Sequence, residues 1–176
     1  MNLKRFFKPL TIMLVTGTIF IFSSINAFGH WYQYGYNLYS FTYSPDSGSD
    51  YWAGQAAKNW RDKAGTTITK STYSNNTVSL ANYNYSWYGL YTPYTNSSGG
   101  VYKFSIKANT YALQDDYTNW DKALISTLTH EFGHAQYLND LESGWGNLSI
   151  MSYERNRETI LTPQAHDIND LNNYRN

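Results

Sequence analysis

The chain has 176 residues, of which 41% are hydrophobic and 15% charged, with a formal net charge of zero and no cysteine. These values favour one globular domain and exclude a disulfide scaffold, a cysteine-based zinc finger and a collagen-like chain. Aromatic residues make up 18% of the chain, and they supply apolar volume for a core.

The N-terminal segment is typical of a secretory signal peptide. Lys4, Arg5 and Lys8 precede an apolar run at residues 10–22, which is shorter than a membrane span, and small residues lead to Ala27. We therefore expect removal of residues 1–27, a secreted, extracellular protein consisting of residues 28–176, and no stable membrane association. Losing three cations turns the balance of 13 basic and 13 acidic residues into a net charge of −3, which gives no basis for binding nucleic acid.

The first part of this expected domain alternates strand and helix patterns. Residues 38–43 end in turn residues and predict a strand. A helix is expected to begin at Ser49 or Asp50 and to end at Gly65. Its apolar side chains recur at helical spacing, at Trp52, Ala56, Ala57 and Trp60. The composition predicts three further strands, at residues 66–72, 77–85 and 101–108.

The second part contains the strongest helix pattern. Thr118-x-x-Asp121 has the form of a capping box, and the helix is expected to run to residues 139–140. Its apolar stripe consists of Ala123, Leu124, Leu128, Phe132 and Ala135. A last helix is predicted from Thr162-Pro163, with a buried side formed by Ile168, Leu171 and Tyr174. This order of elements predicts an α+β fold.

The strong helix carries His130-Glu131-Phe132-Gly133-His134. Two histidines at positions i and i+4 project from one helix face, so both imidazoles can bind one Zn²⁺. Glu131 then lies beside the open coordination position and is the candidate general base. Two polar surface histidines on an amphipathic helix are the alternative interpretation.

A catalytic zinc site normally has three protein ligands. The histidine pair supplies two of them, so a third ligand remains to be identified. Asp140 is the first candidate, because a turn after the helix would return its carboxylate to the metal. The competing candidates are Glu142, Glu154, Glu158, His166 and Asp167, of which His166 is otherwise expected to be a surface residue.

Residues 130–140 and the later Ser149-Ile150-Met151-Ser152-Tyr153 resemble the metzincin zinc peptidases, most closely their matrixin-like bacterial members. The resemblance covers roughly residues 118–174. Two positions depart from the family pattern: Tyr137 replaces a glycine that turns the chain, and Asp140 replaces the third histidine, as in snapalysin-like members. A tyrosine in left-handed backbone costs about 1–2 kcal/mol, so the turn is alternatively expected at Asn139.

The resemblance implies a metzincin-like zincin fold, with a twisted, mainly antiparallel or mixed sheet, an active-site helix and a C-terminal helix. It implies a single metallopeptidase domain in which His130, His134 and Asp140 bind one catalytic Zn²⁺. Met151 would lie in a turn beneath the metal, and the phenol of Tyr153 would approach it. The strand at residues 101–108 would be the exposed edge that aligns a substrate, and an ordinary strand within the sheet is the alternative interpretation.

The function predicted on these grounds is a zinc metalloendopeptidase that hydrolyses peptide bonds with a zinc-bound water and Glu131 as base. Its partners would be protein or peptide substrates, and we expect a monomer. Asp46, Asp50, Asp115 and Asp116 are candidate Ca²⁺ ligands. The alternative is a secreted glycan or cell-wall binding module with a non-catalytic zinc site. Its platform would be aromatic, formed by Trp31, Tyr32, Tyr34, Tyr36, Tyr83, Tyr85, Trp87, Tyr88, Tyr91 and Tyr94.

Overall fold

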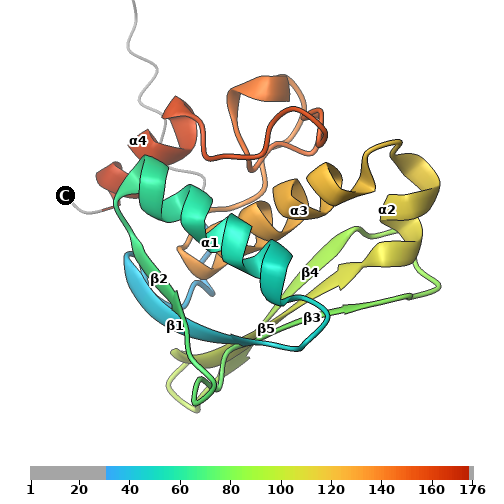
Figure 1. Ribbon diagram of the computed structural model, residues 1–176. Helices are drawn as coiled ribbons and strands as arrows, with labels where there is room; N and C mark the ends of the chain where they lie inside the picture. The colour runs from blue at the N-terminus through green and yellow to red at the C-terminus, as the bar shows by residue number, and fades with distance from the viewer. Residues whose placement is uncertain (1–30, 175–176) are drawn as a thin grey trace, which may run out of the picture.

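A five-stranded mixed sheet forms one layer of the protein in the computed structural model, which describes residues 31–174 (Figure 1). The strands are β1 (Ser40–Pro45), β2 (Thr67–Lys70), β3 (Thr77–Ala81), β4 (Gly89–Thr95) and β5 (Val101–Asn109), in the order β2-β1-β3-β5-β4. The pairs β1/β2, β1/β3 and β3/β5 are parallel, and only β4 runs antiparallel, against β5. The predicted strands at residues 38–43, 66–72, 77–85 and 101–108 correspond to β1, β2, β3 and β5.

The expected edge strand is wrong. Residues 101–108 belong to β5, which lies between β3 and β4, and β4 forms the edge. The chain reverses at residues 96–100, where the Asn96 amide donates to the Gly100 carbonyl at 2.9 Å, so β4 folds back along the outer side of β5. Pro93 in β4 carries no N–H, and proline within a sheet is confined to edge strands and strand ends. Pro93 is therefore the sequence signal for the edge.

Helices α1 (Asp50–Ala64) and α3 (Trp120–Ala135) cross the same face of this sheet (Figure 1). The helix expected to end at Gly65 is confirmed, because Gly65 adopts left-handed backbone, with φ 65°, directly after α1. Helix α3 begins one residue later than the predicted capping box, since Asn119 rather than Thr118 accepts the Lys122 amide. It ends at Ala135, four residues before Asn139.

Three shorter helical segments complete the structure: α2 (Thr110–Asp116), the 3₁₀ turn η1 (Gly146–Leu148) and α4 (Ala165–Asn173). Helix α4 begins two residues after the predicted Pro163. The reason is a capping box in which the Asp167 carboxylate accepts the Gln164 amide at 2.6 Å. The sequence did not predict α2 or η1.

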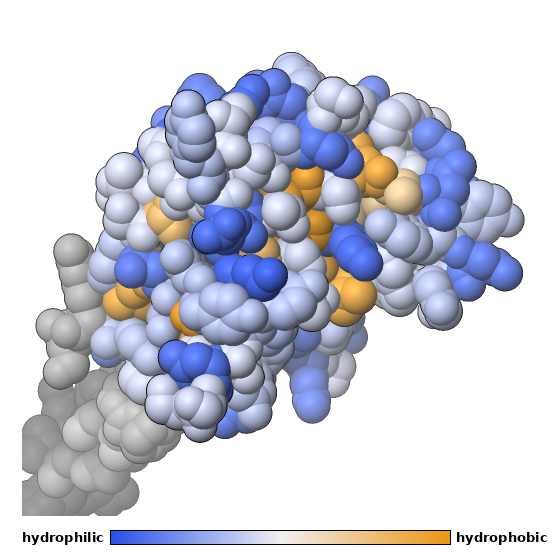
Figure 2. Space-filling model, turned by 90° about the horizontal axis from the view of Figure 1, so that it is seen from below, coloured by the Kyte–Doolittle hydropathy of each residue, from blue (hydrophilic) through white to orange (hydrophobic). Residues whose placement is uncertain are grey.

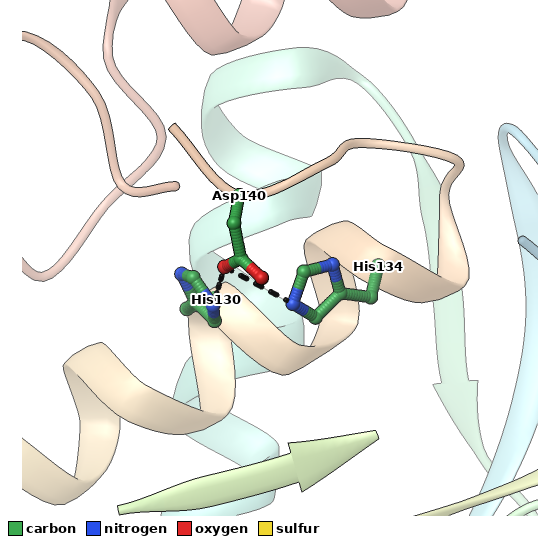
Figure 3. Close-up of side chains that lie close together, drawn as sticks. All are labelled: His130, His134 and Asp140. Carbon is green, nitrogen blue, oxygen red and sulfur yellow. Dashed lines mark ion pairs between the residues drawn. The ribbon is translucent and has the colours of Figure 1, made fainter. Parts of the chain in front are cut away.

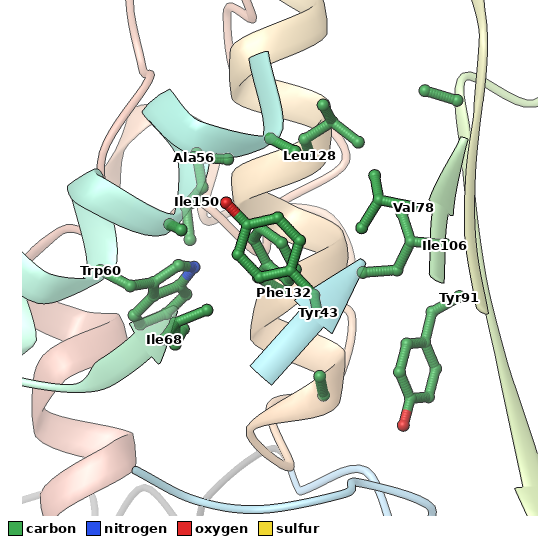
Figure 4. Close-up of a cluster of buried hydrophobic side chains, with 14 of the residues drawn as sticks. Tyr43, Ala56, Trp60, Ile68, Val78, Tyr91, Ile106, Leu128, Phe132 and Ile150 are labelled. Carbon is green, nitrogen blue, oxygen red and sulfur yellow. The ribbon is translucent and has the colours of Figure 1, made fainter. Parts of the chain in front are cut away.

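The core lies between the sheet and the two long helices (Figure 4). Trp60 of α1 and Phe132 of α3 are fully buried, and they meet Tyr43, Ile68 and Ile106 of the sheet. Burying one such side chain stabilises the fold by roughly 1.5–3 kcal/mol. The Trp60 indole also donates to the Thr129 carbonyl at 2.7 Å, which fixes α1 against the helix that carries the two histidines.

Seen from below, the surface is mostly polar, and its hydrophobic residues form small patches rather than one continuous area (Figure 2). Among residues 31–174, no helix combines the length and apolar character needed to cross a membrane. The predicted signal peptide at residues 1–27 lies outside the described residues.

Candidate metal centre and active site

Helix α3 presents His130 and His134 on one face, one turn apart, with ring centroids separated by 4.7 Å. Both rings are oriented by backbone carbonyls: His130 Nδ1 lies 3.0 Å from Ile150 O, and His134 Nδ1 lies 2.9 Å from Leu138 O. Because a carbonyl only accepts, each Nδ1 carries the hydrogen. Both Nε2 atoms are then lone-pair donors, the tautomer that a metal ligand requires.

The chain turns back directly after α3. The Leu138 amide donates to Gly133 O at 3.0 Å and the Tyr137 amide donates to His134 O at 3.1 Å, which together form a Schellman motif. Tyr137 occupies the left-handed position of this motif, with φ 69°, so the alternative turn at Asn139 is wrong. Its ring stacks on Tyr174 at a centroid distance of 5.0 Å and covers Gly35, where a Cβ would approach the ring to 2.4 Å. These aromatic contacts offset the backbone strain.

This turn brings Asp140 back over α3, with its carboxylate facing both imidazoles (Figure 3). Asp140 Oδ1 lies 3.0 Å from His130 Nε2 and 3.5 Å from His134 Nε2, and the three ligand atoms lie within 4.8 Å of one another. Oδ1 is buried and has no hydrogen-bond partner. Two imidazole lone pairs and a carboxylate oxygen repel one another unless a cation lies among them, so this donor set fits a divalent metal ion of the zinc type.

The other candidate ligands lie elsewhere, and no second potential metal cluster occurs among residues 31–174. Glu154 accepts the Gly144 amide, Glu158 accepts the Asn119 amide, and His166 stacks on Trp145 at 4.0 Å and is only partly exposed. Glu142 is exposed and outside the cluster. The candidate calcium ligands are also dispersed. Asp46 accepts the Ser49 amide, Asp50 pairs with Lys70, Asp116 accepts the Tyr88 hydroxyl, and Asp115 belongs to no metal cluster.

Glu131 lies beside the two histidines and is only 4% exposed. Burial raises the pKa of Glu131 to about 7, which is the range in which a carboxylate is an effective base at neutral pH. A bound divalent cation would lower this value, because it favours the charged form. The β4 edge leaves room for the side chain only because position 89 is glycine: a Cβ there would lie 2.3 Å from Glu131 Oε1.

The segment at residues 149–153 packs against the part of α3 that carries the histidine pair. Asp167 of α4 accepts the Ser149 hydroxyl and the Ile150 amide, the latter at 2.8 Å, and Ile150 in turn orients His130. Met151 is 2% exposed and packs against Gly133, where a Cβ would lie only 2.4 Å from its sulfur. A glycine between the two histidines therefore permits the close approach of Met151.

Tyr153 is positioned by the same segment. Its amide donates to Leu141 O at 3.3 Å, and the Leu141 amide donates to Met151 O at 3.0 Å. The Tyr153 hydroxyl donates to Asp140 Oδ2 at 2.8 Å, while the ring is 58% exposed. The phenol thus reaches the carboxylate of the ligand cluster.

These residues open onto a cavity of about 560 Å³. The inner wall contains His130, Glu131, His134 and Asp140, and the β4 edge contributes Gly89, Leu90 and Tyr91. Four residues of the expected aromatic platform line this cavity, namely Tyr32, Trp87, Tyr88 and Tyr91, and Tyr36 packs against Phe41 and Phe104. The ten aromatic residues therefore do not form one exposed platform.

Sequence reasoning missed three residues that shape the site. Gly89 belongs to no sequence motif, and the sequence presents Asp167 only as a candidate metal ligand. Arg155 is buried in the cavity wall although the run at residues 154–158 is polar. Only Asp167, three residues after Gln164, carried a sequence signal, which was the capping-box spacing.

No protein-family model and none of the curated proteins compared matches this chain. Solved structures match in fold. Myroilysin superposes with a TM-score of 0.50 at 13% identity, covering 78% of this chain and 93% of that chain. A chain in the GM1-bound form of the ECX AB5 holotoxin gives a TM-score of 0.52 at 16% identity, covering 80% and 85%.

The fold class is thereby defined. The chain has the expected α+β fold, with a five-stranded mixed sheet, a helix that carries the histidine pair and a C-terminal helix, and this architecture is compatible with the metzincin-like fold expected from the sequence. Its His130, His134 and Asp140 cluster can bind a metal ion.

Proposed function

We propose that the protein is a secreted zinc metalloendopeptidase, similar to the matrixin-like metzincins, that hydrolyses peptide bonds in protein or peptide substrates. The observation that carries the proposal is the convergence of His130 Nε2, His134 Nε2 and Asp140 Oδ1 beside a buried Glu131, at the wall of an open cavity. A purely structural zinc site is normally closed by a fourth protein ligand, and these residues provide three.

A zinc ion held by His130, His134 and Asp140 would polarise the scissile carbonyl and lower the pKa of a water molecule toward about 7. Glu131 accepts a proton from the attacking water and returns it to the leaving amine. The Tyr153 hydroxyl, which donates to Asp140 in this structure, turns to donate to the oxyanion that develops on the substrate.

The edge strand supplies a means of holding the substrate. One side of β4 pairs with β5 and the other has no strand partner in the sheet. Gly89, Leu90 and Tyr91 of β4 line the cavity next to Glu131. An extended peptide can pair with the free main-chain groups of this edge and lie across the ligand cluster.

The experiment compares the purified protein with a Glu131→Gln variant and a matched Glu142→Gln control. Glu142 is exposed and lies outside the ligand cluster. Cleavage of an unfolded protein substrate and zinc content are measured on all three proteins. We expect about one zinc per chain in each, cleavage by the wild type and Glu142→Gln, and loss of cleavage in Glu131→Gln. Zinc binding without any cleavage by the wild type would contradict the proposal.

Export and chain boundaries belong to the same proposal, in which residues 28–176 form one monomeric catalytic domain. The charge and apolar pattern of residues 1–27 supports export. N-terminal sequencing of the protein recovered from culture medium is expected to begin at Phe28. Retention of Lys4 and Arg5 in the recovered protein would contradict signal cleavage.

The second candidate, a glycan-binding module, is favoured by one observation. The ring centroids of Tyr83 and Trp87 lie 4.9 Å apart, and the Tyr85 ring stacks on Trp87 at a centroid distance of 6.0 Å. Tyr85 is 67% exposed. Such rings can stack on sugar faces. The test is a glycan array probed with the wild type and with Glu131→Gln. Glycan binding by both proteins, combined with no peptide cleavage by the wild type, would favour this candidate over the peptidase.

A further inference from the structure

Two buried arginines follow the Met151 turn and line the same cavity as the ligand cluster. Arg155 is 3% exposed and Arg157 is 8% exposed, and both contribute to the cavity wall with His130 and Glu131. Both guanidinium groups are charged at neutral pH. The cavity wall therefore carries two positive charges that the proposed hydrolysis does not use.

The partners of both guanidinium groups are neutral. Arg155 donates to the Ser126 hydroxyl at 3.1 Å and to Ser152 O at 2.8 Å. Arg157 donates to the Tyr117 hydroxyl at 3.1 Å and to Tyr153 O at 3.3 Å. Its Nε has no hydrogen-bond partner. In the part of the chain that the structure describes, neither arginine forms an ion pair with a carboxylate.

The surrounding charges leave this side of the cavity cationic. Glu131 and Asp140 lie on the metal side, where a divalent ion would compensate them, and Asp116 accepts the Tyr88 hydroxyl at 2.7 Å. The Arg157 guanidinium lies over the Tyr88 ring, 4.7 Å from its centroid. Burial, and after it the neighbouring charge of Arg157, lowers the pKa of Arg155 to about 9. The carboxylates of Glu131 and Asp167 offset this effect only in part, since neither forms an ion pair with Arg155. Two buried like charges without a paired anion are destabilising, and an anion bound between them relieves both costs.

We propose that this arginine pair determines substrate specificity by binding a substrate carboxylate next to the scissile bond. Arg157 contacts the carboxylate through its planar fork, and Arg155 strengthens the field behind it. The carboxylate belongs to an acidic side chain or to the C-terminus of the substrate. This inference rests on the proposed function, because it specifies which peptides the same cavity accepts.

The first test uses the wild-type protein alone, so it does not depend on the folding of any variant. Fluorogenic peptides of one sequence carry Glu, Gln, Lys or Leu at a single position, which is moved along each side of the scissile bond. We expect kcat/KM for Glu to exceed that for Gln by at least about tenfold at one position, and Lys to be the poorest. The same peptides with a free or an amidated C-terminus distinguish a terminal carboxylate from a side chain.

The second test removes the charge of Arg157. Arg157→Gln is expected to reduce the Glu over Gln preference to below about threefold, mainly by lowering kcat/KM for the Glu peptide. The matched control is Lys58→Gln, since Lys58 is an exposed cation on α1 that pairs with Asp62 and does not line the cavity. The control should retain the wild-type preference. Arg157→Lys keeps the charge and should restore part of it, which a purely structural role of Arg157 would not produce.

A binding measurement separates failure of this inference from failure of the proposed function. Fluorescence anisotropy with Glu131→Gln compares dansylated Glu and Gln peptides without any cleavage. Preferential binding of the Glu peptide by Glu131→Gln, together with a zinc-loaded wild type that cleaves none of the peptides, would refute the peptidase and retain the carboxylate site. Cleavage by the wild type at equal rates for Glu, Gln and Leu peptides at every position, with or without a free C-terminus, would overturn the inference and leave the peptidase intact.

Discussion

Substitution of Gly133 by alanine tests whether the close approach of Met151 supports the histidine pair. A Cβ at position 133 would lie 2.4 Å from Met151 Sδ, 3.1 Å from its Cε and 3.3 Å from Trp60 Cζ2. Ordinary contacts are about 3.5–4.0 Å, so the thioether must move by roughly 1 Å. Met151 is 2% exposed and Trp60 is fully buried, which leaves little room for that movement.

The expected effect is the difference between two opposing contributions. Overpacking a buried site costs about 1–3 kcal/mol, while alanine stabilises a helix interior by about 1 kcal/mol relative to glycine. Gly133→Ala should therefore lower the free energy of unfolding by roughly 0–2 kcal/mol, and it should weaken zinc binding as Met151 shifts beneath His130. Gly54→Ala is the matched control, because Gly54 lies inside α1 with no atom within 4 Å of an added Cβ. It should stabilise the protein by about 0.5–1 kcal/mol.

The assay is urea unfolding of a double-mutant cycle with Met151→Val, which removes the sulfur and the terminal methyl group. In the Met151→Val background, Gly133→Ala should lower the free energy of unfolding by about 1–3 kcal/mol less than it does in the wild type. This difference is the overpacking cost that disappears when the sulfur and the methyl group are absent. Additivity within about 0.5 kcal/mol would refute the reasoning, as would a Gly133→Ala variant as stabilised as Gly54→Ala.

Three further changes test the ligand cluster and the base. Asp140→Ala should lower zinc affinity by more than about 100-fold in a chelator competition, because loss of a direct ligand exceeds the 10–100-fold effect of an outer-shell partner, and unchanged affinity would exclude Asp140 as a ligand. Gly89→Ala would place a Cβ 2.3 Å from Glu131 Oε1, so kcat should fall by about 100-fold while zinc content is retained. Burial lowers the pKa of His134, but Asp140 and Glu131 outweigh it and raise the pKa above its usual value, so protons compete with zinc for Nε2 near neutral pH. Zinc affinity should therefore fall as the pH is lowered from about 7.5 to 5.5, and a pH-independent affinity in the same competition would argue against histidine ligation.

The sequence predicted the helices correctly where the apolar pattern of the sequence matches the side chains that the fold buries. The apolar stripe of α3 is completely buried, and α1 ends at the left-handed Gly65. The two histidines were predictable because i, i+4 spacing alone places them on one face. The sequence also favours Asp140 as the third ligand, and the structure brings its carboxylate to both imidazoles.

The errors arise where tertiary contacts decide between local alternatives. Tyr137 keeps the left-handed backbone because Tyr174 and Gly35 pack against its ring, and those partners are remote in sequence. The position of β5 inside the sheet follows from the β4 hairpin, whose Pro93 indicated an edge strand. The burial of Arg155 and Arg157 in a polar run depends on Ser126 and Tyr117, which no local pattern connects to them.

The central claim is that one zinc ion is bound by three residues of this chain and remains open toward the cavity. Anomalous diffraction at the zinc edge from crystals of the zinc-loaded protein tests this claim most directly. The account predicts one strong peak about 2.0–2.2 Å from His130 Nε2, His134 Nε2 and Asp140, with no fourth protein ligand. A peak ligated by other residues, or a site closed by a fourth side chain, would contradict it.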